Sequence, residues 1–156
     1  MYALFVRSGY ELMVLKELEK RGIKGFVPQQ IRLERRRKKW HTVPRLLIPS
    51  YVFVEMPMTP IFYYLAKNTV GAIAFVGGGE PLELSQADKR YIRFLANNGK
   101  PIEPLYIDSK QRFINFCLQD LKMVHYQKRQ RKAMVELDFF GDKKRFTLSV
   151  IEADTL

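Results

Sequence analysis

A short, densely charged segment constrains the fold of this chain more than any other feature. The window 29–45 carries +6 of the formal net charge of +11, because it contains seven Lys and Arg residues and a single acidic residue, Glu34. Runs of like charge are typical of solvated segments. Extended stretches lie on both sides, so we interpret the window as a strand, a loop and a strand that form an arm. Its cations are Arg32, Arg35, Arg36, Arg37, Lys38, Lys39 and Arg45.

The rest of the composition indicates a folded protein. In 156 residues, 47% hydrophobic and 13% aromatic residues suffice for one domain or two small ones and argue against global disorder. No run of about 18 apolar residues and no signal-peptide pattern occurs, so we expect a cytoplasmic location and no membrane partner. Cys117 is the single cysteine and only two histidines accompany it, which excludes an internal disulfide and a thiolate metal site.

Three segments before residue 97 carry the signals of helices. Ser8 as N-cap and Glu11 three residues later have the spacing of a capping box. Thr59 precedes a proline suited to a first helical position, and Ser85 is a further N-cap candidate. The helices are expected over 9–21, 61–67 and from 85 to about 96.

Strand signals alternate with these helices. Apolar alternation and enrichment in β-branched and aromatic residues mark the extended segments. The triple glycine 77–79 is not followed by the lysine and hydroxyl of a phosphate-binding loop, so it is interpreted as a turn. The predicted strands are 2–7, 26–27, 31–35, 51–55 and 72–76.

A change in composition divides the chain after these elements. Asn-Asn-Gly and two prolines within 97–104 are typical of a linker. We therefore predict a first domain over 1–97, a linker over 98–108 and a small second domain over 109–156.

The second domain is expected to be mostly β-structure. Alternation over 132–140 and 146–150 predicts a β-hairpin. The segment 111–124 fits helical spacing about as well as short strands, and periodicity leaves the two open. Cys117, between two apolar neighbours, is expected to be buried. A small barrel of four or five strands is the natural architecture for so short a domain.

Four strings follow one another in the first domain, and in this order they resemble the NusG family. The resemblance implies an α+β fold: a NusG N-terminal-like domain, with an antiparallel sheet flanked by helices, followed by a small KOW-like β-barrel. The strings 128–140 and 145–151 look like the last strands of that barrel. The four strings are Tyr2-Ala3-Leu4-Phe5-Val6-Arg7-Ser8-Gly9, Phe26-Val27-Pro28, Pro49-Ser50-Tyr51-Val52-Phe53-Val54, and Asn68-Thr69-Val70-Gly71 leading into Phe75-Val76-Gly77-Gly78.

Departures from the general family pattern indicate a specialised paralogue. The Arg-rich string 128–133 and the ending 148–152 look most like the LoaP subgroup. RfaH-type members carry a His-Thr-Thr string where Phe62, Tyr63 and Tyr64 stand here. We therefore rank a LoaP-like protein above an RfaH-like one, and an RfaH-like helical state of 111–124 stays open.

The resemblance implies docking on the clamp helices of bacterial RNA polymerase through an apolar pocket at the edge of the N-terminal sheet. Aromatic rings beside a proline-stiffened turn supply contact area at a low cost in ordering entropy. Tyr2 and Phe75 are equally well explained as ordinary core residues. Ile48 precedes Pro49 in a loop, where a core position is less expected, which favours a polymerase-binding role. The predicted polymerase-binding residues are Tyr2, Ile48, Pro49, Tyr51 and Phe75.

The residues of the arm predict a nucleic-acid contact independently of the family resemblance. Arg and Lys neutralise phosphates, and aromatic rings stack on bases. The alternative is a solvated hairpin, but five consecutive cations beside a tryptophan favour nucleic acid. A LoaP-like protein makes an RNA hairpin the sharper expectation, and non-template DNA is the family's general one. The predicted residues are Arg32, Arg35, Arg36, Arg37, Lys38, Lys39, Trp40, His41 and Arg45.

These observations predict a transcription elongation factor that promotes processive antitermination. We expect a monomer without cofactor or catalytic activity, because no acid–base pair, metal cluster or cofactor loop emerges from the sequence. The C-terminal domain is expected to recruit a ribosomal protein or a termination factor, or to contact RNA. The alternative is a standalone RNA-binding or ribosome-assembly module that does not need polymerase.

Overall fold

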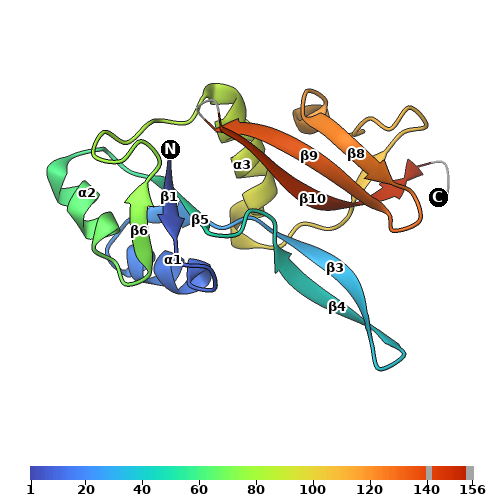
Figure 1. The fold of residues 1–156 in the computed structure, drawn as a ribbon, viewed down its shortest axis with the longest axis horizontal. Coiled ribbons are helices and arrows are strands. Elements are labelled where there is room, and N and C mark those ends of the chain that lie inside the picture. The colour runs from blue at the N-terminus through green and yellow to red at the C-terminus, as the bar shows by residue number, and fades with distance from the viewer. Residues whose placement is uncertain (140–141, 154–156) are drawn as a thin grey trace. The chain divides into compact units, whose positions relative to one another are not determined.

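The computed structural model describes residues 1–139 and 142–153 (Figure 1). Contacts between residues divide the chain into two units: the first comprises Met1–Val27 and Ile48–Arg93, the second Pro28–Leu47 and Phe94–Leu156. The arm thus interrupts the first unit in sequence but belongs to the second. The division into a first domain over 1–97, a linker over 98–108 and a second domain over 109–156 stays a prediction.

The first unit contains an antiparallel sheet of four strands in the order β2-β5-β1-β6. The central strands β1 and β5 pair from Tyr2 opposite Val54 to Phe5 opposite Tyr51. Apolar side chains of both strands are fully buried, among them Leu4 and Val52, which explains the strong strand signal in the sequence. The strands are β1 (Tyr2–Val6), β2 (Lys24–Phe26), β5 (Tyr51–Glu55) and β6 (Ala72–Phe75).

Three helices accompany this sheet in the order that the sequence predicts. Thr59 Oγ1 accepts a hydrogen bond from the Phe62 amide at 3.4 Å. Ser85 Oγ accepts one from the Asp88 amide at 3.1 Å. Both predicted N-caps are therefore confirmed. The helices are α1 (Glu11–Lys20), α2 (Pro60–Lys67) and α3 (Gln86–Ala96), of which α3 continues past Arg93 into the second unit.

The predicted N-cap of α1 is wrong. The helix begins at Glu11, its N-cap residue is Tyr10, and no side chain caps it. The Glu11 carboxylate, on a side chain only 2% exposed, instead accepts hydrogen bonds from the amides of Gly9 and Ser50, each at 3.1 Å. Glu11 thus connects the start of α1 to the loop before β5. Gly9, with a φ of +92°, makes the turn that brings its own amide to the same carboxylate.

Glu11→Ala is expected to lower the free energy of unfolding by about 2 kcal/mol, because it removes the buried carboxylate that accepts hydrogen bonds from the Gly9 and Ser50 amides. Urea denaturation of the full chain measures this. Glu19→Ala is the matched control, since Glu19 lies exposed on the same helix. Equal losses in the two variants would contradict the role assigned to Glu11.

The second unit contains a four-stranded sheet in the order β7-β10-β9-β8. Strand β7 runs parallel to β10, and the other pairs are antiparallel. The predicted hairpin is confirmed as β9 and β10, although Phe140 and Gly141 of its turn lie outside the described residues. Alternate residues of both strands, such as Val135 and Leu148, are fully buried. The strands are β7 (Leu105–Ile107), β8 (Lys122–Gln127), β9 (Lys132–Phe139) and β10 (Asp142–Glu152).

The segment 111–124, which the sequence left open, contains no α-helix. It forms a short 3-10 turn, Phe116–Leu118, before β8 begins. The Asn115 side chain accepts a hydrogen bond from the Cys117 amide at 2.9 Å. Cys117 is exposed, so its predicted burial is wrong: Leu118 fills the core position instead, with none of its surface exposed.

The arm is a β-hairpin, as predicted. Strand β3 (Gln29–Arg36) pairs with β4 (Lys39–Leu46) from Gln29 opposite Leu46 to Arg36 opposite Lys39. Only Arg37 and Lys38 connect the two strands. The predicted loop is therefore a two-residue turn.

Candidate nucleic-acid interface

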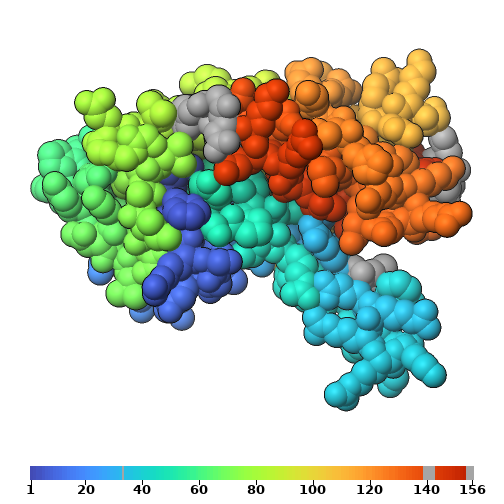
Figure 2. All heavy atoms as spheres, in the orientation of Figure 1, coloured from blue at the N-terminus to red at the C-terminus, as the bar shows by residue number. Residues whose placement is uncertain are grey.

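The turn of the arm presents its cations to solvent. Arg37 and Lys38 have φ values of +52° and +64°, the backbone of a type I′ turn, which matches the twist of the two strands. All residues from Arg35 to Thr42 are exposed. In the space-filling view the end of the arm stands clear of the other atoms of its unit (Figure 2).

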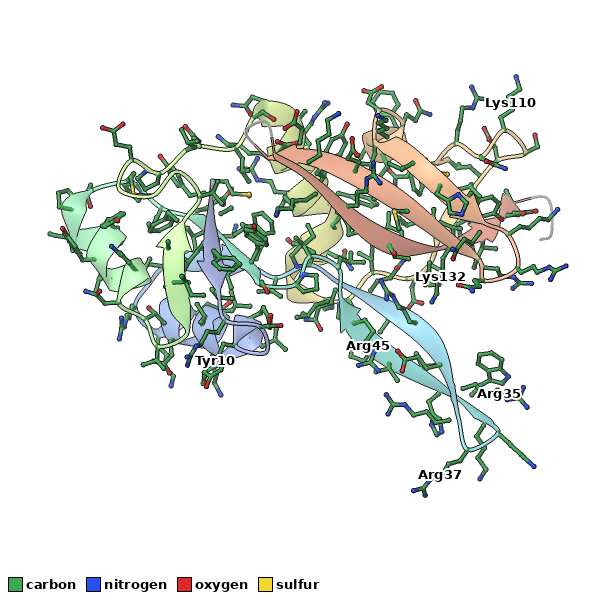
Figure 3. The ribbon with its side chains drawn as sticks, in the orientation of Figure 1. Tyr10, Arg35, Arg37, Arg45, Lys110 and Lys132 are labelled. Atoms are coloured by element: carbon green, nitrogen blue, oxygen red, sulfur yellow. The ribbon has the colours of Figure 1, made fainter. Side chains whose placement is uncertain are left out.

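Trp40 lies among these cations. Its side chain is 64% exposed, and it stands directly opposite Arg35 in the hairpin register. The Arg35 guanidinium carbon lies 6.0 Å from the centre of the indole ring, at the limit of a cation–π contact. The tip therefore offers a flat aromatic surface next to donors for phosphate oxygens, the combination that single-stranded nucleic acids require. Figure 3 labels Arg35 and Arg37 at this end of the hairpin.

The only acidic residue of the arm is held by arginines. Glu34 Oε1 accepts a hydrogen bond from Arg45 Nε at 2.5 Å, and Glu34 Oε2 accepts from Arg45 Nη2 at 2.6 Å and Arg36 Nη2 at 3.1 Å. These hydrogen bonds, those from Arg45 above all, lower the pKa of the Glu34 carboxyl from 4.5 to about 2. Arg45 is consequently engaged within the arm and is not part of the open tip.

Arg32 lies at the base of the arm and contacts the C-terminal sheet. Its Nη2 donates a hydrogen bond to the Thr147 carbonyl of β10 at 2.7 Å. Burial lowers the pKa of the Arg32 guanidinium, and its buried Nε has no hydrogen-bond partner among the described residues. Arg32 is therefore an internal contact of the second unit.

The predicted polymerase-binding residues fall on both faces of the N-terminal sheet. Tyr2 and Phe75 lie on one face with their rings edge to face, 6.5 Å apart. Tyr63 of α2 stacks on Phe75 at 5.5 Å. Phe75 is only 3% exposed, so this cluster is largely core.

Tyr51 lies on the opposite face, next to an aromatic residue that the sequence did not single out. Its ring centre is 5.6 Å from that of Phe5, its register partner, and the Phe5 side chain is 39% exposed. Pro49 is exposed, but Ile48 is only 5% exposed, so the expectation that a loop position keeps Ile48 out of the core is wrong. Removing the apolar Ile48 side chain from water gives a favourable free energy, which favours burial even at a loop position before Pro49.

Nothing in the described part of the chain points to metal chemistry or to a membrane span. No group of three or more His, Cys, Asp or Glu side chains among residues 1–139 and 142–153 is arranged to hold a metal ion. No helix in the same ranges has the length and apolar character that crossing a bilayer requires.

Comparison with known proteins identifies the family. A family model described as "Transcription termination factor nusG" matches residues 1–93. The chain belongs to the NusG family. The proteins named "Transcription termination/antitermination protein NusG" of Staphylococcus aureus strains Mu50 and N315 are each 33% identical to it over 104 residues. These matches cover 58% of this chain and 57% of each relative, so this NusG-family chain spans little more than half of their length.

A solved structure supports the fold of this NusG-family chain. The structure described as "Domain interaction in Thermotoga maritima NusG" superposes with a TM-score of 0.58 and 24% sequence identity, covering 96% of this chain and 92% of that one. The predicted fold class is confirmed: α+β, with a NusG N-terminal-like domain and a C-terminal sheet domain of the KOW-like kind.

The structure of this NusG-family chain thus separates residues that the sequence grouped together. Of the nine predicted arm residues, Arg32 and Arg45 are engaged near the base, Arg36 donates a hydrogen bond to Glu34 while remaining exposed, and the other six lie at or beside the tip. The residues that sequence reasoning missed are Phe5 and Tyr63. The alternation along β1 places Phe5 on the face opposite Tyr2 and could have indicated its position beside Tyr51. No sequence pattern indicates that Tyr63 stacks on Phe75.

The Glu34 carboxylate is expected to stabilise the arm above pH 4.5 and to lose this contribution as the pH falls toward 2. The sign follows because a lowered pKa means that the folded state binds the proton more weakly than the unfolded chain does. The melting temperatures of the wild type and Glu34→Gln should therefore differ above pH 4.5 and converge as the pH falls from 4.5 toward 2. A difference that does not change with pH would contradict the assignment, and NMR titration of the Glu34 carboxyl checks its pKa directly.

Proposed function

We propose that this chain is a transcription elongation factor of the LoaP type, which binds RNA polymerase and holds an RNA hairpin on its arm to promote processive antitermination. Membership of the NusG family supports the general role. The finer assignment rests on the exposed tip of the arm and on the Arg-rich string 128–133 that resembles the LoaP subgroup.

The tip is the observation that carries the nucleic-acid part of the proposal. Five cations form and flank the two-residue turn beside Trp40, and the one carboxylate of the arm already binds Arg45 and Arg36. Such a surface binds phosphates by releasing counterions and stacks on unpaired bases, as a hairpin loop offers them. The cations are Arg35, Arg36, Arg37, Lys38 and Lys39.

The polymerase contact is proposed for the face that carries Phe5 and Tyr51. Two adjacent rings, one of them 39% exposed, supply a large apolar contact with few rotatable bonds. The clamp helices of bacterial RNA polymerase are the partner that the family resemblance implies. In the second unit Phe116, 83% exposed, and Ile114, 50% exposed, are the proposed contact for a ribosomal protein or a termination factor.

The triple variant Arg35→Gln, Arg37→Asn, Lys38→Gly tests the arm. It removes three charges while Asn-Gly suits the type I′ turn, so the melting temperature should not fall. Affinity for an RNA stem-loop is expected to drop about tenfold or more, and the slope of log K against log salt to fall by about 2 to 3. Quenching of Trp40, the single tryptophan, reports binding at several salt concentrations.

The matched control removes the same charge outside the arm. Lys16, Lys20 and Lys110 are exposed, and their replacement by glutamine should leave the salt slope unchanged. Wild-type affinity in the arm variant, or equal losses in both variants, would overturn the proposed role of the arm.

Retention on immobilised RNA polymerase tests the docking face. The double variant Phe5→Ala, Tyr51→Ala should be retained at least about tenfold less than the wild type, since aromatic anchors dominate interface energies. Leu12→Ala with Met13→Ala is the control, because both side chains are about half exposed on α1. Equal retention of the Phe5–Tyr51 variant would contradict this docking face. A wild type that is not retained would instead favour the standalone RNA-binding module.

A further inference from the structure

The two faces of the arm hairpin carry different chemistry. Residues directly opposite each other in an antiparallel pair share a face, and neighbours along a strand alternate between the faces. The register therefore places Arg35 and Trp40 on one face, and Glu34 with His41 on the other. Figure 3 shows Arg35 and Arg45 on opposite sides of the hairpin, in agreement with this register. The only carboxylate of the arm thus lies on the face that does not carry the tryptophan.

Glu34 occupies the guanidinium of Arg45 on its own face. Arg45 stands opposite Gln30, nearer the base of the arm, so its side chain extends toward the tip to reach the carboxylate. Its Nε and Nη2 donate to the two carboxylate oxygens at 2.5 and 2.6 Å, and Arg36 Nη2 adds one hydrogen bond at 3.1 Å. The Glu34 side chain is 27% exposed. This face therefore holds its arginines in an internal ion pair.

A phosphate group would need the same donors. Two parallel N–H groups of one guanidinium bind two oxygens of a phosphate in the same way as two oxygens of a carboxylate. The Glu34 carboxylate belongs to the same hairpin as Arg45, so it competes with a phosphate at a high effective concentration. A nucleic-acid backbone that approaches this face meets donors that are already occupied, together with a negative charge.

The opposite face has no such competitor. Arg35 is exposed and is paired with no carboxylate in the part of the chain that the structure describes. Its guanidinium carbon lies 6.0 Å from the centre of the Trp40 indole, whose side chain is 64% exposed. An unpaired base can stack on this ring beside the free guanidinium. A duplex cannot use the ring in this way, because its bases are already stacked within the helix.

We propose that Glu34 is a specificity-determining residue of the arm: it withholds Arg45, and in part Arg36, from phosphates, so that the arm binds unpaired RNA in preference to paired RNA. This inference rests on the proposed function of the arm. A duplex binds through its backbone and loses the withheld arginines, whereas a loop keeps all its contacts with the Trp40 face. The preference thus comes from a repulsive element as well as from an attractive one.

Glu34→Gln tests the proposal, because glutamine keeps the shape of the side chain and removes its charge. The affinity for an RNA duplex of about two helical turns should rise about five- to tenfold, and the slope of log K against log salt should steepen by about 1 to 2. The affinity for a single-stranded RNA should change by less than about threefold, because the Trp40 face keeps its contacts and distant charges are screened. The anisotropy of labelled RNA at several salt concentrations measures both affinities.

Two further variants control for net charge and identify the cation that is set free. Glu80→Gln removes the same charge from an exposed glutamate outside the arm and should change neither affinity. Adding Arg45→Gln to Glu34→Gln should cancel most of the gain for the duplex, since Arg45 is the cation that the loss of the carboxylate sets free. Equal changes in Glu34→Gln and Glu80→Gln, or equal gains for duplex and single strand, overturn the proposal.

The state of Arg45 in the complex can be observed directly by proton–nitrogen correlation NMR of the full chain. In the wild type, single-stranded RNA should shift the Trp40 Nε1–H signal and leave the Arg45 Nε–H signal in place. In Glu34→Gln, the RNA duplex should shift the Arg45 signal. A purely structural ion pair would not produce this difference between the two proteins. An Arg45 signal that moves equally in the wild type on addition of duplex overturns the inference.

The outcomes separate this inference from the function on which it rests. Wild-type affinity for the stem-loop in the arm variant Arg35→Gln, Arg37→Asn, Lys38→Gly overturns the proposed function itself. Loss of affinity in that variant, with wild-type duplex affinity and salt slope in Glu34→Gln, overturns the role of Glu34 and leaves the arm as the RNA-binding site. A thermal melt shows that Glu34→Gln is folded at the assay temperature. A fall in both affinities in this variant assigns Glu34 a structural role and likewise overturns its role in specificity.

Discussion

The buried amide of Gln30 is the contact on which the placement of the arm depends. Three hydrogen bonds satisfy it, two to the backbone of Ser149 and one to the Glu103 carbonyl. A buried polar group left without partners costs about 1 to 3 kcal/mol, so any movement of the arm base away from β10 is opposed. For this reason a hairpin that interrupts the N-terminal unit in sequence folds as part of the C-terminal one.

Along the arm, the cations change from internal contacts to an open surface. At the base, Arg32 donates to a main-chain carbonyl, and farther along the hairpin Arg45 neutralises Glu34. Beyond them, the register brings Arg35 opposite Trp40, and the type I′ turn exposes Arg37 and Lys38. The net charge of the window is therefore concentrated at the exposed tip, where Glu34 is the one carboxylate of the arm and already binds Arg45 and Arg36. An exposed cluster of cations of this kind suits the binding of a polyanion.

Sequence reasoning was accurate where the signal is local. The strand at Tyr51–Glu55 and the N-caps Thr59 and Ser85 agree with the structure, because side-chain alternation and capping depend on residues within one turn or strand. It was wrong where a distant partner competes. Ser8 does not cap α1, whose N-cap residue is Tyr10, and Glu11 instead bonds the amide of Ser50. Cys117 is exposed, and its neighbour Leu118 occupies the core. Tyr2 and Tyr51, grouped by family position, point to opposite faces of their sheet.

The sequence by itself determined that a charged hairpin lies between two strands of a NusG-like domain and that its tip is solvated. It did so because charge density and strand alternation are properties of neighbouring residues. Only the tertiary structure decided which cations are open, which face carries the exposed aromatic pair, and that the base of the arm is anchored to β10. Those relations join residues more than a hundred positions apart, such as Gln30 and Ser149, through hydrogen bonds that no local pattern encodes.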